Sequence, residues 1–138
     1  MAYKKLFIDS DILLDTVLIR IPFFDDSLKV TSLAGDERFI CSTTVHCLLN
    51  VHYLAKKKYG ERLARQSVAA LAKKMKIVIE DGETINRAVE SDFIDFEDAV
   101  QYYAAINGEC DVIITRNTKD YKQATIPVLT AEEFLRQL

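Results

Sequence analysis

Acidic and amide side chains recur in this sequence where an apolar run ends or a helix begins. Asp9 follows the apolar run 6–8, Asp98 lies in the first turn of a predicted helix, and the polar segment 117–120 follows another apolar run. Ligands of open parallel sheets bind beyond the carboxyl ends of the strands. If these strands are neighbours, the polar side chains converge on one site. The candidate residues are Asp9, Asp11, Asp98, Asn117 and Asp120.

The chemistry of such a cluster depends on a cation. Carboxylates a few Å apart repel one another, and their pKa values rise unless a positive charge neutralises them. Hard oxygen ligands without a paired histidine or cysteine favour Mg²⁺ or Mn²⁺ over zinc. Such an ion activates a bound water and stabilises charge on a phosphate. The cluster therefore predicts metal-dependent chemistry on a phosphate ester.

A purely structural explanation exists for part of this pattern. Acids near helix N-termini are favoured by the helix dipole and by capping, which accounts for Asp95 and equally well for Asp11 as an N-cap. Asp98 is followed by Ala99-Val100, so we expect a buried position that capping does not explain. For Asn117 and Asp120, a role in shaping a turn is as well supported as a role in the site.

Length and composition predict one globular domain spanning residues 1–138. The chain has 138 residues, of which 49% are hydrophobic, enough for a single core. No apolar run is long enough to span a membrane, and the first residues lack the pattern of a secretory signal, so we expect a cytoplasmic protein. The three cysteines form no CxxC pair, which indicates reduced thiols and no zinc site.

The charges are segregated along the chain although the formal net charge is only −3. Residues 56–76 are mainly basic, and residues 80–98 are mainly acidic. Each run is explained by a solvated helix face. A basic flank beside an acidic pocket also suits a metal-dependent enzyme that acts on a polyanion.

Strands and helices are expected to alternate. The apolar runs predict strands at 6–8, 38–41, 77–79, 111–115 and 127–129. Helical spacing predicts helices at 12–20, from Pro22 to about 33, at 45–58, 61–74 and 83–90, then one closed by Gly108 and one after the capping box Thr130–Glu133. This order predicts an α/β fold, a three-layer α/β/α sandwich around a mostly parallel sheet.

Three segments together resemble the PIN domain family. The segment 7–15, FIDSDILLD, is similar to the family's first strand and helix, 95–101, DFEDAVQ, to a later helix start, and 112–121, VIITRNTKDY, to the end of another strand. The resemblance runs over nearly the whole chain. It implies a small Mg²⁺- or Mn²⁺-dependent endoribonuclease similar to the VapC-like toxins of bacterial toxin–antitoxin pairs, with RNA, a small antitoxin protein and a second copy of the chain as partners.

The resemblance also implies roles for individual residues. Asp9 and Asp98 match metal-binding acids, and Asp120, assisted by Asn117, matches a further one, so Asp9, Asp98 and Asp120 are the expected catalytic residues. Many family members carry a glutamate in the helix after the second strand. We align Asn50 with that position, where an amide oxygen supplies a ligand without charge.

The departure at Asn50 bears on activity. Asp11 stands where asparagine is usual in the family, and its charge partly replaces the one that Asn50 lacks. We expect weak or strongly metal-dependent cleavage, and we expect Asn50→Glu to tighten Mn²⁺ binding. RNA is expected to contact the basic side chains Lys56, Lys57, Arg116 and Lys119.

Two alternatives remain open at the level of the sequence. A catalytically silent PIN fold that binds RNA or protein is favoured by Asn50. A haloacid-dehalogenase-like phosphatase is suggested by the pattern Asp9-Ser10-Asp11, with Ser42 as the strand-end hydroxyl. The chain is short for that phosphatase class, and Asp98 would have no role in it.

Overall fold

A computed structural model describes residues 3–138 and contains a five-stranded sheet in the order β3-β2-β1-β4-β5. All four strand pairings are parallel. The strands are β1 (Lys5–Ile8), β2 (Ile40–Thr43), β3 (Lys76–Ile77), β4 (Val112–Ile114) and β5 (Val128–Leu129). Residues 1 and 2 of the predicted domain lie outside the described residues.

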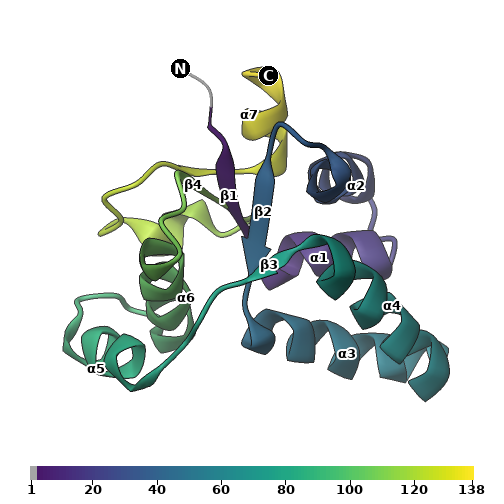
Figure 1. Cartoon of the computed structure of the whole chain (residues 1–138), viewed down its shortest axis with the longest axis horizontal. Coiled ribbons are helices and arrows are strands. Elements are labelled where there is room, and N and C mark those ends of the chain that lie inside the picture. Colours follow the sequence, from purple (N-terminus) through teal and green to yellow (C-terminus); the bar gives the residue numbers. More distant parts are fainter. Residues whose placement is uncertain (1–2) are drawn as a thin grey trace.

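Helices cover both faces of this sheet, which confirms the predicted three-layer α/β architecture. The helices are α1 (Ser10–Val17), α2 (Phe24–Ser32), α3 (Val45–Tyr59), α4 (Glu61–Lys74), α5 (Gly82–Glu90), α6 (Phe96–Asn107) and α7 (Ala131–Arg136), with short 3-10 turns η1 (Leu33–Gly35) and η2 (Thr118–Tyr121). Helices α1 to α4 lie on one side of the strands and α5 and α6 on the other (Figure 1). Helix α7 packs beside α2.

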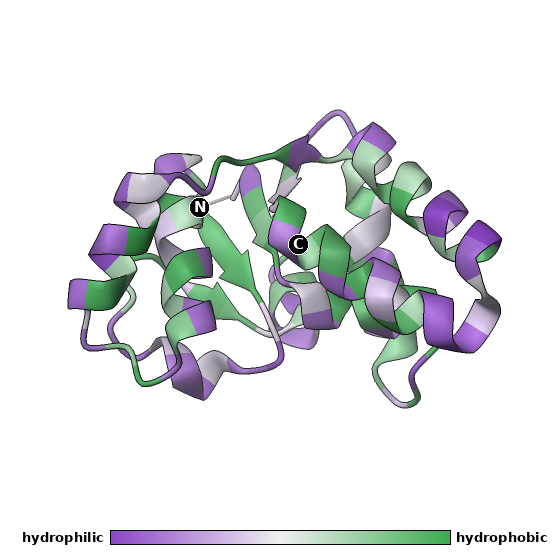
Figure 2. Cartoon of the chain, turned by 90° about the horizontal axis from the view of Figure 1, so that it is seen from below, coloured by the Kyte–Doolittle hydropathy of each residue, from purple (hydrophilic) through white to green (hydrophobic). Residues whose placement is uncertain are grey.

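The core lies between these layers. The side chains of Leu6, Phe7 and Ile8 in β1 and those of all three residues of β4 are fully buried. Figure 2 shows the strands as the hydrophobic centre, with polar residues on the outer faces of the helices. Strands covered on both faces require continuous apolar runs, which is why β1 and β4 were recognisable in the sequence.

The pairing of β1 with β4 positions the site. Ile8 pairs with Ile114, so both strands end at the same edge of the sheet. The backbone N–H of Asp9 donates to the carbonyl of Ile114 at 3.1 Å. Asp9 and Thr115, which are far apart in the sequence, are therefore neighbours at the carboxyl edge.

Several predicted boundaries were wrong, including that of the first helix, which was predicted at 12–20 and spans Ser10–Val17. The second strand runs to Thr43 rather than ending at Cys41, because it pairs with β1 on one side and β3 on the other. The second helix begins at Phe24 rather than at Pro22, because Phe23 lies in a turn under the guanidinium of Arg116. The third strand is shortened to Lys76–Ile77.

No helix within residues 3–138 combines the length and the apolar character needed to cross a membrane.

Candidate active site

Asp9 is fixed at the junction of β1 and α1. It is the N-cap of α1, and its side chain accepts hydrogen bonds from the backbone N–H of Ser10 at 2.6 Å and from the hydroxyl of Thr115 at 2.7 Å. Only 3% of Asp9 is exposed. Both donors are neutral, so the carboxylate is oriented without being neutralised.

Asp11 lies beside Asp9 in the first turn of α1 and is not the cap of that helix. Its Oδ2 accepts from the backbone N–H of Arg116 at 3.1 Å and lies 3.2 Å from the Thr115 hydroxyl. That hydroxyl has a single proton, so it donates to only one of the two carboxylates at a time. The other oxygen of Asp11, Oδ1, is buried without a hydrogen-bond partner.

Asp98 approaches from the other side of the sheet, in the first turn of α6. Asp95 caps this helix by accepting the backbone N–H of Asp98 at 2.9 Å, which leaves the Asp98 side chain free to face the site. Asp98 is buried, and the Tyr121 hydroxyl lies 3.5 Å from its Oδ1. The capping explanation therefore accounts for Asp95 and leaves Asp98 unexplained.

The electrostatics couple these acids. Burial, and then the negative charges of Asp11 and Asp98, raise the pKa of Asp9 to about 7. Burial, and then the charges of Asp95 and Asp120, raise the pKa of Asp98 to about 7 as well. Each carboxyl group resists ionisation because no cation balances it. The cluster thus has the charge distribution of a cation-binding site.

Asn117 and Asp120 lie at the rim. The backbone N–H of Asn117 donates to Thr115 Oγ1 at 3.1 Å, and that of Asp120 donates to the carbonyl of Asn117 at 3.0 Å, which forms the turn leading into η2. Both side chains are exposed, and the charge of Asp120 acts on Asp98. The structure therefore brings Asp120 toward Asp98, while the same segment also forms a turn.

Asn50 is placed differently from the acids. It is half-buried on α3, and among the described residues its side chain makes no hydrogen bond with Asp9, Asp11 or Asp98. One turn earlier on the same helix, Cys47 is fully buried, and its Sγ lies 3.5 Å from Gln101 Oε1 on α6.

Cys47 is also coupled to the acids. Burial, and then the charge of Asp9, raise the pKa of the Cys47 thiol to about 12, so the thiol is protonated at neutral pH. On α3, Cys47 in the first turn is therefore the residue close to the acidic cluster, rather than Asn50. As it stands, it contributes a neutral side chain and no charge.

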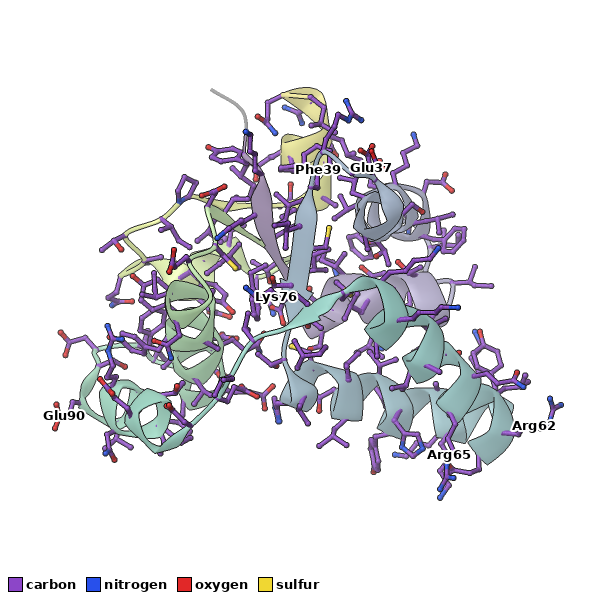
Figure 3. The ribbon with its side chains drawn as sticks, viewed as in Figure 1. Glu37, Phe39, Arg62, Arg65, Lys76 and Glu90 are labelled. Carbon is purple, nitrogen blue, oxygen red and sulfur yellow. The ribbon has the colours of Figure 1, made fainter. Side chains whose placement is uncertain are left out.

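The predicted RNA-binding residues form two groups. Arg116 and Lys119 lie next to the acids, on the segment that follows β4. Lys56 and Lys57 lie at the far end of α3, about 15 Å along the helix from Cys47. The α3–α4 hairpin carries its basic side chains away from the sheet, as the labelled Arg62 and Arg65 show (Figure 3).

Three residues of the site were missed by the sequence reasoning: Thr115, Tyr121 and Cys47. Thr115 follows β4 directly, so the strand-end rule that selected Asp9 also points to it. Tyr121 and Cys47 offered no such signal. In the sequence, both residues resemble ordinary core residues, and it is the fold that places them beside the acids.

The donor set suits a hard divalent cation. In the described part of the chain, no three histidine, cysteine or carboxylate side chains already surround a common point as metal ligands. Mg²⁺ is usually held by one or two carboxylates, with waters and substrate oxygens completing its coordination. Asp9 and Asp98 supply two carboxylates, and the unpartnered Asp11 Oδ1 supplies a further oxygen. These residues fit Mg²⁺ or Mn²⁺ better than zinc.

The chain is similar to known proteins over nearly its whole length. A sequence profile described as PIN domain matches residues 5–119. Ribonuclease VapC1 of Aquifex aeolicus (strain VF5) is 24% identical over 139 residues, covering 97% of this chain and 95% of that protein.

Solved structures share the fold. A toxin-antitoxin complex from Klebsiella pneumoniae matches with a TM-score of 0.67 and 22% identity, covering 91% of this chain and 97% of that chain. VapBC2 from Rickettsia felis, bound to a DNA fragment from its promoter, matches with a TM-score of 0.66 and 14% identity, covering 91% and 96%.

Proposed function

Because the chain belongs to the PIN domain family, we propose that it is a metal-dependent endoribonuclease and the toxin of a toxin–antitoxin pair. The observation that carries this proposal is the buried proximity of Asp9, which follows β1, and Asp98 on α6. Within residues 3–138, neither forms an ion pair with a cationic side chain. Uncompensated buried charge is costly, and a protein retains it where a ligand supplies the opposite charge.

Each polar residue has a defined part in this proposal. Asp9 and Asp98 hold Mg²⁺ or Mn²⁺, with Asp120 and Asn117 assisting from the rim and Asn50 as a further, neutral candidate. The ion supplies an activated water and stabilises charge on the phosphate. Thr115 orients Asp9 by donating its proton to Oδ2, and the backbone N–H of Ser10 donates to Oδ1, so the remaining lone pairs of these two oxygens are left for the ion.

RNA is held by charge in this scheme. Arg116 and Lys119 contact the phosphates nearest the acids, and Lys56 and Lys57 contact the strand farther along. Each neutralised phosphate releases counterions, so binding weakens steeply as salt increases. If RNA affinity is unchanged between 50 and 200 mM salt, the basic flank has no part in binding.

The proposal is tested by a ribonuclease assay with Mg²⁺ or Mn²⁺ on the purified chain and on Asp9→Asn and Asp98→Asn. We expect each substitution to reduce cleavage by at least ~100-fold, because each removes a metal ligand while preserving the size of the side chain. The matched control is Asp36→Asn, since Asp36 pairs with Arg38 at the surface, outside the site. Circular dichroism verifies that all variants are folded.

The results separate the alternatives. If neither substitution lowers cleavage, the catalytic proposal is wrong. If the wild-type chain binds RNA and Mn²⁺ but cleaves nothing, it is a silent binding module. Hydrolysis of p-nitrophenyl phosphate that is lost in Asp9→Asn favours a phosphatase, although Ser42 lies inside β2 opposite Phe7 and not at a strand end.

Protein partners are part of the proposal: a small antitoxin and a second copy of the chain. Large apolar side chains are exposed on two surfaces, one on α3 with Val45, Leu49 and Tyr53 and one around α5 with Val89 and Ile94. Exposed apolar surface of this kind is typical of interaction sites. Light scattering of the purified chain measures self-association, and relief of growth arrest by a co-expressed neighbouring gene identifies an antitoxin.

A further inference from the structure

A cavity of about 480 Å³ lies beside the acidic site and is not used by the metal chemistry. It is enclosed by α1, the turn before α2, the segment after β4 and the start of α7. Its volume falls within the range of about 300–1,000 Å³ that is typical of small-molecule sites. The residues that carry the argument are Phe23, Asp26, Arg116, Asn117 and Glu132.

The cavity and the acidic site share one segment of backbone. Thr115 bonds to Asp9, the backbone N–H of Arg116 donates to Asp11, and the side chains of Arg116 and Asn117 line the cavity. A polymer whose phosphate lies at the acids therefore has its adjoining group within reach of the cavity.

One wall of the cavity is a fixed, flat stack. The Arg116 guanidinium carbon lies 4.1 Å from the centre of the Phe23 ring, and Arg116 Nε forms an ion pair with the buried Asp15 at 3.2 Å. Arg116 is 30% exposed at its side chain, and Phe23 is 41% exposed. Aromatic rings and arginine planes of this kind stack unpaired nucleobases.

The rim of the cavity is rich in hydrogen-bond acceptors. Asp26 and Glu132 contribute two carboxylates, and Asn117 adds an amide oxygen. Glu132 also pairs with Arg136, and the guanidinium of Arg116 is already paired with Asp15. A phosphate would be repelled by the carboxylates. A neutral aromatic ring that carries N–H donors satisfies both the flat wall and the acceptors.

We propose that this cavity binds one unpaired base of the RNA beside the cleaved phosphate and prefers a base with an exocyclic amino group. The base stacks against Phe23 and Arg116, and its amino group donates to Asp26 or Glu132. This inference rests on the proposed ribonuclease function and adds a sequence preference to it. Uracil, which presents a carbonyl in place of the amino group, is the disfavoured base.

Cytosine and uracil provide the matched probes, because their rings are the same size. The amino group of cytosine offers two N–H donors, which can reach both carboxylates, whereas uracil offers a single donor, its N3–H, beside a carbonyl at position 4. We measure the affinities of the whole chain for the RNA octamers C8 and U8 by fluorescence anisotropy in EDTA, which prevents metal-dependent cleavage. We expect C8 to bind at least about fivefold more tightly than U8, the lower end of the discrimination given by a specific base contact.

Two variants and a control locate the preference. Phe23→Ala should weaken C8 binding about tenfold without changing the dependence of affinity on salt, because stacking releases no counterions. The combined change Asp26→Asn and Glu132→Gln should bring C8 and U8 to equal affinity. Leu28→Ala, at a residue of α2 that is 39% exposed and outside the cavity, should leave both affinities unchanged.

The outcomes distinguish a failure of the proposed base site from a failure of the proposed ribonuclease function. If C8 and U8 bind equally to the wild-type chain, or if Phe23→Ala behaves as Leu28→Ala does, the base site is wrong while the ribonuclease proposal stands. That result would favour a cationic side chain of a partner protein as the occupant. If neither octamer binds at low salt, both proposals fail.

Discussion

Two buried aspartates six residues apart, Asp9 and Asp15, have opposite electrostatic surroundings. Asp15 is fully buried at the end of α1, but Arg116 lies 3.2 Å and Arg20 3.9 Å from its oxygens, and Ser27 donates a hydrogen bond to it. Asp9 is almost as buried, and its hydrogen bonds come only from neutral donors.

The difference separates an acid whose charge the fold balances from one whose charge it leaves unbalanced. Burial raises the pKa of both carboxyl groups, and at Asp15 the two arginines oppose that rise. At Asp9 the nearby charges of Asp11 and Asp98 add to it. The fold therefore supplies the counter-ions of Asp15 and leaves the charge of Asp9 to be balanced by something that binds.

The largest expected effect is that Asp15→Asn and Asp9→Asn change the free energy of unfolding in opposite directions. Asp15→Asn should lower the free energy of unfolding by about 2 kcal/mol, less than for a fully buried pair because both arginines are partly exposed. Asp9→Asn should raise it by about 1 kcal/mol at pH 8 without metal, because it removes an uncompensated buried charge. Urea unfolding in EDTA measures both values.

A loss of stability in both variants would remove the distinction between the two acids. Asp36→Asn serves as the control, since it alters a surface ion pair, for which we expect little change in the free energy of unfolding.

The second prediction concerns Mn²⁺, which would supply the positive charge that Asp9 lacks. Mn²⁺ should raise the Tm of the wild-type chain at pH 8 and should do so equally in Asp15→Asn, provided that variant is folded. It should have little effect on Asp9→Asn. A ligand present at 100 times its Kd stabilises a protein by about 2.7 kcal/mol. Differential scanning fluorimetry at several Mn²⁺ concentrations gives the shift, and an equal shift in Asp9→Asn would place the ion elsewhere.

Much of the fold followed from local signals, which explains what the sequence predicted well. The apolar strands are buried on both faces, Gly60 ends α3 with a φ of 89°, and Thr130 caps α7 with Glu133 as its reciprocal partner. Each of these features depends on residues within a few positions of one another. The boundary errors at Pro22 and Ser42 arose where contacts distant in the sequence decided the structure.

The site was predictable only in part for the same reason. Asp9 and Asp98 were selected because each stands at a strand end or a helix start, where its neighbours are local. Cys47 faces the acids because α3 packs near α6, and the Phe23–Arg116 stack joins residues 93 positions apart. The periodicity and spacing of residues in a single sequence do not predict such contacts between distant residues.

The third prediction concerns pH and has a definite sign. The pKa of Asp9 is about 7 in the folded chain and near the ordinary aspartate value of 3.8 when unfolded, so between these values the folded state binds more protons. Stability contributed by this group is therefore present at low pH and is lost as the pH rises from about 4 to above 7.

This effect is isolated by comparing the wild-type chain with Asp9→Asn in EDTA at pH 5, 6, 7 and 8. The free energy of unfolding of the variant, relative to wild type, should increase by about 2–3 kcal/mol between pH 5 and pH 8. The corresponding difference for Asp36→Asn should be flat over that range, because hydrogen bonds from the side chain and backbone of Arg38 lower the pKa of Asp36 to about 2. A flat profile for Asp9→Asn would mean that Asp9 is ionised throughout.

The smallest expected effect shows which position of α3 lies nearer to the acidic cluster around Asp9, that of Cys47 or that of Asn50. Cys47→Asp replaces a thiol by a carboxylate of similar size at a fully buried position that responds to the charge of Asp9. Asn50→Glu adds a carboxylate one turn farther along the same helix. Both should tighten Mn²⁺ binding, and Cys47→Asp should do so more, by about tenfold against a few-fold, because its charge lies nearer the acids.

Titration calorimetry at pH 8 measures the two affinities, and unfolding in EDTA provides the second readout. Without metal, Cys47→Asp should lose stability because it adds a further carboxylate to the cluster of Asp9, Asp11 and Asp98, while Asn50→Glu, which is half-buried, should lose little. A larger gain in affinity from Asn50→Glu would show that the family's glutamate position lies at Asn50. No gain from either would confine the site to Asp9, Asp98 and the rim.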